Sequence, residues 1–269
     1  VVPGRVDSKA AERVEFVPAY YSREHASFKG DFICCRHTLE HIQSTQEFVQ
    51  VVRDSVDGAL ETPIFFEVPD TVRVLQEAAF EDIYYEHCSY FTPGSLARLF
   101  QTCNFEVRDL YLDYGDQYLF IEAKPVELPS QEMPSLAESV EDTIQYIEQF
   151  KSLIHKKLNW WRNKLESWQQ DGDKVVVWGS GSKCVSFLTT LNTIDKIQYV
   201  IDINPHRQGK FIPGVGKQIQ SPEFLKTYNP DRIIIMNSIY KPEIQEKLQS
   251  MQVDAELIAL GDEMQHIPD

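Results

Sequence analysis

The stretch that decides the fold runs from Lys174 to Cys184 and reads KVVVWGSGSKC. Its apolar run is typical of a strand buried on both faces of a parallel sheet. The Gly-Ser-Gly-Ser turn then leads into a predicted helix that ends at Leu191, and a second predicted strand over 197–201 ends at Asp202. A strand, a glycine turn, a helix and a second strand together predict a Rossmann-like α/β unit.

The glycine turn and Asp202 are close to the dinucleotide fingerprint. In that motif glycines let the backbone approach a pyrophosphate, and the acidic residue holds a ribose hydroxyl. Cys184 departs from the motif because it occupies the third glycine or alanine position. Three interpretations remain: a nicotinamide cofactor site, a site for another nucleotide, and a structural scaffold.

The segment 202–214 is polar, basic and rich in turn residues. It follows the carboxyl end of a predicted strand, where open α/β sheets bind their ligands. Arg207 and Lys210 are therefore candidates to contact a phosphate. The alternative is a solvated loop that carries two surface cations.

The rest of the second half predicts strands over 232–236 and 255–260 with a helix over 241–251 between them. The helical pattern over 135–170 predicts a connecting helix or helix pair whose apolar stripe packs on its neighbours. We expect the tryptophans of this stripe to be packing residues, and the proline-rich segment 125–134 to be a linker.

The first half predicts a second α/β sheet. Short strands are expected over 13–17, 32–35 and 64–68, with the strand over 32–35 buried, and helical spacing runs from Leu39 to Val52. A helix begins at Pro93, and two runs joined at Tyr114-Gly115-Asp116 predict a β-hairpin. We therefore predict three parts: a sheet domain over 1–126, a linker with helices over 127–172, and a Rossmann-like domain over 173–269.

Composition limits the classes of function. The 269 residues carry a formal net charge of −15, which repels phosphate backbones and disfavours nucleic-acid binding. No apolar run approaches the roughly 20 residues that cross a bilayer, and no signal peptide is visible. Five cysteines without a C-x-x-C pair predict reduced thiols and a cytoplasmic protein.

The segment Tyr84–Phe91 (YYEHCSYF) is the first place to look for acid–base chemistry. It holds an imidazole and a phenol within a few residues, among aromatic residues that can exclude water. Histidine accepts protons near neutral pH, and a nearby tyrosine or carboxylate can orient it or stabilise an oxyanion. The alternative is a core aromatic cluster with one hydrogen-bonded histidine.

The segment His37–His41 reads H-x-x-E-H, which is the pattern of one class of zinc peptidases. We do not predict a metal site there, because the motif follows directly on a predicted strand. No third ligand stands out at a suitable downstream spacing either.

Several motifs in order resemble the S-adenosylmethionine-dependent sugar C-methyltransferases, which methylate a carbon of a nucleotide-linked 4-keto-deoxysugar. Motifs in the second half of the chain resemble the C-terminal domain of these enzymes as well. The motifs are DFICCRH from Asp31, LEH from Leu39, FEVP from Phe66, IYYEHCSYF from Ile83, VWGSGSK from Val177, VIDINP from Val200, QGK from Gln208 and PG from Pro213.

The resemblance implies a fold, a reaction and the residues that carry it out. It implies a partial class I methyltransferase (Rossmann-like) sheet ending in an antiparallel hairpin, a helical connector and a second Rossmann-like domain. His87, assisted by Tyr84, would remove a proton next to the sugar ketone, and the enolate would attack the methyl group of S-adenosylmethionine. Glu86 would orient the base or the substrate. The cofactor would be bound by Asp31, Arg36 and His37, and the substrate by Lys183, Arg207 and Lys210.

The sequence also departs from this family. The family's zinc-binding domain and glycine-rich cofactor loop are not recognisable before Val14, so we expect a C-terminal part of such an enzyme. The acidic residue for the cofactor ribose is not assignable, with Asp7 no more than a guess. Two rival hypotheses remain: an NAD-dependent oxidoreductase that uses the Gly179 turn, and a non-catalytic nucleotide-sugar-binding module.

Overall fold

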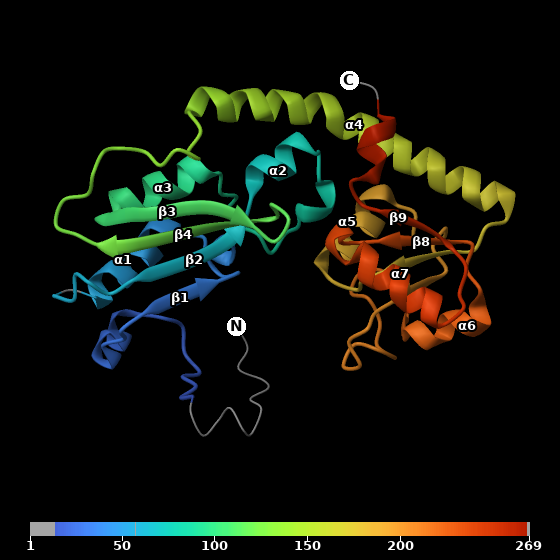
Figure 1. Cartoon of the computed structure of the whole chain (residues 1–269), viewed down its shortest axis with the longest axis horizontal. Helices are drawn as coiled ribbons and strands as arrows, with labels where there is room; N and C mark the ends of the chain where they lie inside the picture. Colours follow the sequence, from blue (N-terminus) through green and yellow to red (C-terminus); the bar gives the residue numbers. More distant parts are fainter. Residues whose placement is uncertain (1–13, 57, 268–269) are drawn as a thin grey trace.

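The computed structural model describes residues 14–56 and 58–267, which contain two sheets and one long helix alongside both (Figure 1). The first sheet has the order β1-β2-β4-β3; the β1–β2 pair is parallel and the other pairs are antiparallel. Its strands are β1 (Ile33–Arg36), β2 (Ile64–Pro69), β3 (Phe105–Asp113) and β4 (Tyr118–Pro125). The predicted α/β sheet that ends in an antiparallel hairpin is confirmed.

Helices pack against this sheet through apolar side chains. Val49 and Val52 of one helix and Phe100 of another share a buried core with Phe66 and Ile121 of the strands. The helical elements of this part are η1 (Arg23–Phe28), η2 (Leu39–His41), α1 (Thr45–Ser55), α2 (Thr71–Gln76), η3 (Phe80–Asp82) and α3 (Pro93–Thr102).

The start of α3 follows from its sequence. The Thr92 side chain accepts a hydrogen bond from the Ser95 backbone N–H, and the Ser95 hydroxyl lies 2.9 Å from the Thr92 backbone nitrogen. Pro93 occupies the first turn, where its missing N–H costs nothing. The predicted helix start is confirmed.

Two expectations for the first sheet were wrong. Residues 14–17 form no strand, and Val14, Phe16 and Val17 are exposed rather than paired. The strand predicted over 32–35 is β1, but its side chains alternate between half-buried and exposed. Among the described residues β1 pairs only with β2, so it is an edge strand. The apolar run at 32–35 predicts a strand buried on both faces, but at the edge of the sheet only alternate side chains are half-buried. Asp7 lies outside the described residues.

The connecting segment is a single helix, α4 (Val140–Asp171), which runs along both sheets at the top of Figure 1. The apolar stripe of α4 was predicted to pack on its neighbours, but only part of its length does so. Trp161, Leu165 and Trp168 are buried, whereas Ile144 and Ile147 near its start are exposed. The buried part packs on the second sheet, so the tryptophans are packing residues as predicted.

The second sheet is entirely parallel and has the order β7-β6-β5-β8-β9. This is a doubly wound Rossmann-like order that starts in the middle of the sheet and reverses between β5 and β8. Its strands are β5 (Val175–Trp178), β6 (Tyr199–Ile201), β7 (Ile219–Gln220), β8 (Arg232–Ile235) and β9 (Glu256–Ala259). The pattern around the glycine turn correctly predicted this unit.

Helices cover both faces of the second sheet. On one face Phe187 of α5 packs with α4, and on the other Ile244 and Leu248 of α7 pack with the strands. Phe80 belongs to the first half of the chain but is buried in the core of the second, so the two halves share apolar contacts. The helical elements here are α5 (Ser182–Leu191), η4 (Pro222–Phe224), α6 (Leu225–Tyr228), η5 (Ser238–Tyr240), α7 (Lys241–Ser250) and η6 (Asp262–His266).

Within the described ranges no helix combines the length and the apolar character needed to span a bilayer.

Candidate active site

The segment 84–91 is a loop held in place by backbone hydrogen bonds. Tyr84 O accepts from His87 N at 3.1 Å, which closes a tight turn. The backbone oxygen of Glu40 accepts from Cys88 N at 2.8 Å and from Ser89 N at 3.1 Å. These bonds fix the loop against η2, so residues more than forty positions apart meet at one place.

Tyr84 and His87 form an aromatic pair whose ring centroids are 4.1 Å apart. Burial is the main cause that lowers the pKa of His87, and burial also raises the pKa of Tyr84 well above its usual range. The imidazole is therefore neutral and able to accept a proton, while the phenol keeps its proton and can donate a hydrogen bond. The loop thus places a base beside a hydrogen-bond donor.

Glu86 contributes its backbone to this arrangement. Its carbonyl oxygen lies 2.7 Å from Nδ1 of His41, and the rings of His41 and His87 are 4.9 Å apart between centroids. In the sequence, His41 belongs to the H-x-x-E-H pattern and to the LEH motif of the family resemblance, but it was not predicted as a residue of this site. The signal available in the sequence was its position just after a strand's carboxyl end, where α/β sheets gather ligand-binding residues.

Arg36 and His37 lie at the carboxyl end of β1 and both contact the buried carboxylate of Glu67. Arg36 Nε pairs with Oε2 of Glu67, and His37 Nε2 lies 2.8 Å from Oε1. The hydrogen bond to Glu40 is the first cause that raises the pKa of His37. A cavity of about 490 Å³ borders these residues together with Tyr118.

The position of this cavity bears on where a methyl donor could bind. Arg36 and His37 line it at the carboxyl ends of two parallel strands, which is where α/β sheets hold cofactors, so these two residues fit that role. Asp31 lies before the first residue of β1 and does not line the cavity. The structure therefore groups two of the three predicted cofactor residues and separates the third.

A larger cavity, of about 950 Å³, lies at the carboxyl ends of β5, β6 and β8, next to the point where the strand order reverses. Tyr84 and Tyr118 reach it from the first half of the chain. From the second half it is lined by the glycine turn and by polar residues, among them Ser180, Lys183, Asp202, Arg207, Asn237 and Tyr240. Open α/β sheets bind nucleotides at such a reversal point.

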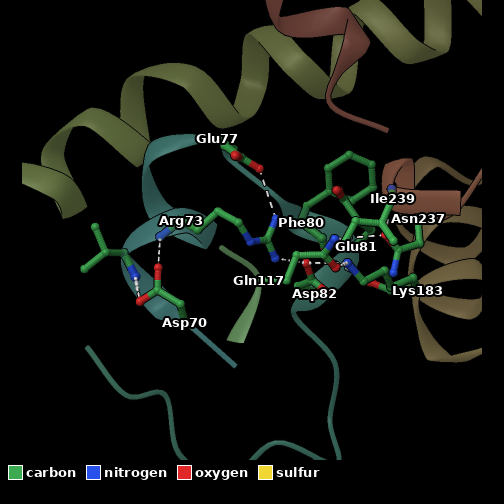
Figure 2. Close-up of polar contacts among 12 residues, drawn as sticks. Asp70, Arg73, Glu77, Phe80, Glu81, Asp82, Gln117, Lys183, Asn237 and Ile239 are labelled. Carbon is green, nitrogen blue, oxygen red and sulfur yellow. Dashed lines mark hydrogen bonds and ion pairs between the residues drawn. The ribbon is translucent and has the colours of Figure 1, made fainter. Parts of the chain in front are cut away.

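Lys183 and Arg207 both line the large cavity, but both also have protein partners. Lys183 Nζ lies 3.0 Å from Oδ2 of Asp82 and 3.3 Å from Oε1 of Gln117, contacts that join the two halves of the chain (Figure 2). Arg207 Nη1 lies 3.4 Å from Oδ2 of Asp202. Lys210 lies in the following turn, outside the cavity lining.

Asp202 is used within the turn itself. Its Oδ2 accepts from the Ser180 backbone N–H at 3.0 Å and from the Ser180 hydroxyl, and its Oδ1 accepts from Asn204 N at 2.8 Å. Burial opposes ionisation, but these hydrogen bonds and the charge of Arg207 lower the pKa of Asp202. The carboxylate that would hold a ribose in a dinucleotide site instead fixes the glycine turn.

The H-x-x-E-H segment does not form the continuous helix that a zinc peptidase uses. His37 has a left-handed backbone conformation with φ of 45°, and Leu39–His41 is a 3₁₀ turn. The segment is the corner after a strand, as its sequence context indicated.

Comparison with known families and proteins gives consistent results. Residues 5–110 match a family described as a methyltransferase domain, and residues 133–259 match the C-methyltransferase C-terminal domain. The chain is 28% identical over 248 residues to the C-methyltransferase NovU of Streptomyces niveus. The match covers 86% of this chain and 58% of that protein, so the chain spans less than two thirds of its relative's length.

The order of the two domains in this chain, a methyltransferase domain followed by the C-terminal domain of C-methyltransferases, agrees with the motifs found in the sequence. Both halves of the chain are therefore similar to C-methyltransferases: the first matches a methyltransferase domain and the second the C-methyltransferase C-terminal domain.

Proposed function

We propose that this chain takes part in transfer of a methyl group from S-adenosylmethionine to the carbon next to the ketone of a nucleotide-linked deoxysugar. The observation that carries the proposal is the Tyr84–His87 pair. The two rings are 4.1 Å apart, and Tyr84 lines the 950 Å³ cavity at the reversal point of the second sheet. A base, a donor and space for a nucleotide are thus close together.

His87 acts as the base. A carbon next to a ketone releases its proton only when a positioned base receives it, and a neutral imidazole serves this purpose near neutral pH. The Tyr84 phenol donates a hydrogen bond to the enolate oxygen, where negative charge develops. Glu86 orients the base or the substrate: its carbonyl oxygen holds His41 beside His87.

S-adenosylmethionine, when bound, supplies an electrophilic methyl group on a sulfonium. Arg36 and His37 would position it from the cavity at the carboxyl end of β1. Asp31 precedes the first residue of β1, at the end opposite Arg36, and does not line that cavity.

The nucleotide sugar occupies the cavity between the two halves of the chain. Arg207 and Lys183 would contact its phosphates, and Lys210 would approach from the neighbouring turn. This places the nucleotide on the Rossmann-like domain over 173–269 and the sugar toward the domain over 1–126, with 127–172 as the connector.

Proton removal is the step that tests this function most directly, because it can be followed without methyl transfer. A dTDP-linked 4-keto-6-deoxysugar is incubated with the protein in D₂O, and exchange of the proton next to the ketone is followed by NMR. We expect exchange with the unaltered chain and with His155→Gln, an exposed histidine of α4. We expect none with His87→Asn. Full exchange by His87→Asn would contradict the assignment.

Binding measurements separate the alternatives. Calorimetry with S-adenosylhomocysteine, NAD and dTDP distinguishes a methyltransferase, which binds the first ligand, from an oxidoreductase, which binds the second. Binding of dTDP alone would favour a nucleotide-sugar-binding module without catalysis.

A further inference from the structure

Three metal-ligating side chains meet beside the Tyr84–His87 pair. Glu40 and His41 belong to η2, and His87 comes from the loop 84–91. One ligand-type atom from each of the three residues lies within 4.8 Å of the other two. Backbone hydrogen bonds from Cys88 and Ser89 to Glu40 O hold the two segments together, so this grouping is part of the fold.

The Glu40 carboxylate is buried, and one of its two oxygens lacks a hydrogen-bond partner. The residue is 2% exposed, and its Oε2 makes no hydrogen bond to any residue in the described ranges. Its Oε1 forms an ion pair with His37, 3.6 Å from Nδ1, and lies 4.0 Å from His41 Nε2. A buried polar oxygen without a partner is costly, and a bound metal ion would satisfy Oε2.

His41 is oriented as metal-binding histidines are. A carbonyl oxygen can only accept a hydrogen bond, so Nδ1 of His41, 2.7 Å from Glu86 O, must carry the ring proton. In the neutral imidazole Nε2 then keeps its lone pair, and this nitrogen lies 4.0 Å from Oε1 of Glu40. A metal-ligating imidazole usually donates a hydrogen bond from its other ring nitrogen to a carboxylate, a backbone carbonyl or water, which fixes the ring orientation.

The donor set selects the class of metal. Two imidazole nitrogens and one carboxylate oxygen suit zinc and neighbouring divalent transition metals, whereas calcium and magnesium prefer oxygen ligands alone. With metal–ligand bonds of about 2.0–2.2 Å, donor atoms in such a site lie roughly 3–3.5 Å apart. Metal binding would require side-chain rotations that shorten the 4.0 Å between Glu40 Oε1 and His41 Nε2, and the other separations of up to 4.8 Å, to that range.

We propose that Glu40, His41 and His87 bind a divalent transition metal of the zinc class, and that this metal competes with the substrate proton for His87. A metal and a proton use the same lone pair of an imidazole. The metal-bound chain would therefore be inactive, and removal of the metal would free the base. Metal binding does not depend on the proposed function, but the competition rests on it.

The binding test uses the chain without a histidine tag, after chelator treatment and dialysis. Co²⁺ binding is followed by visible absorption and Zn²⁺ binding by calorimetry. We expect one ion per chain, with affinity at least tenfold weaker in Glu40→Gln and in His41→Ala. Cys88→Ser and His155→Gln should keep the original affinity, because neither residue is in the ligand group. His41 is exposed, so its variant is expected to fold, and circular dichroism checks this for both variants.

Failure to bind either ion, or binding that survives both Glu40→Gln and His41→Ala, would overturn the site. The competition is tested with the D₂O exchange reaction: Zn²⁺ should stop exchange, and a chelator should restore it. Full exchange by zinc-loaded chain would overturn the competition. A metal-free chain without any exchange would count against the proposed function, while the cobalt titration would still decide the metal site.

Discussion

Lys183 Nζ lies 3.0 Å from Oδ2 of Asp82, an ion pair between residues 101 positions apart that joins the two halves of the chain at the wall of the large cavity. The same carboxylate also pairs with Arg73, whose side chain is 13% exposed (Figure 2). Asp82 thus neutralises one cation from each half of the chain.

Replacing Asp82 with Asn should destabilise the protein strongly. The change leaves Lys183 with only the neutral Gln117 side chain and Arg73 with only Glu77, and breaking a buried ion pair from one side costs about 3–5 kcal/mol. Urea denaturation should show this loss in the free energy of unfolding. Lys183→Met is the matched comparison, because Asp82 then keeps Arg73 as its partner. The free energy of unfolding that Lys183→Met loses should be less than half of what Asp82→Asn loses. Equal stability of Asp82→Asn and the unaltered chain would refute the role.

The stabilisation by Asp82 should depend on pH in a defined direction. Burial raises the pKa of Asp82, but Lys183 and Arg73 outweigh this and place it below its ordinary value. A carboxyl group whose pKa is lower in the folded state stabilises fully above its unfolded pKa of about 3.9, and the effect is lost as pH falls through the folded pKa. The difference in unfolding free energy between the unaltered chain and Asp82→Asn should be constant above about pH 5 and shrink below about pH 4. Urea titrations across this range measure it; a difference that grows in acid would be inconsistent with this pairing.

Gly115→Ala should weaken the contact between the β3–β4 hairpin and the second half of the chain. Gly115 has φ of +64°, and an added Cβ would lie 2.9 Å from Cδ1 of Ile239. The left-handed backbone alone costs about 1–2 kcal/mol, and the clash adds to it. Adding Ile239→Ala to Gly115→Ala should relieve the clash but not the backbone strain, so thermal unfolding should show only a partial recovery of the melting temperature. Gly214→Ala, with φ of +70° and nothing within 4 Å, is the control for strain alone.

Tyr84→Phe should reduce kcat for methyl transfer by about 100- to 1,000-fold, because a hydrogen-bond donor to a developing oxyanion contributes on this scale. KM should change little, since the ring itself remains in the cavity. Steady-state assays with Tyr85→Phe provide the control, as Tyr85 is adjacent but 91% exposed. Unchanged turnover by Tyr84→Phe would rule out the phenol as the donor.

Local patterns in the sequence correctly predicted much of the fold. The apolar run before Gly179, the proline at the start of α3 and the turn at Tyr114-Gly115-Asp116 each specify their element within a few residues. The patterns failed where burial depends on a neighbour. Residues 14–17 alternate like a strand but have no partner strand, and Ile144 continues the stripe of α4 beyond the surface that covers it.

By itself, the sequence determined the two α/β units, the helical character of the segment between them and the segment that carries Tyr84 and His87, because periodicity and turn chemistry act over short distances. Only the tertiary structure placed the Glu40 carboxylate and His41 beside His87, and Lys183 against Asp82. These pairings join segments from about forty to a hundred positions apart, and no local pattern encodes them. They arise from the packing of η2 against the loop and of one half of the chain against the other.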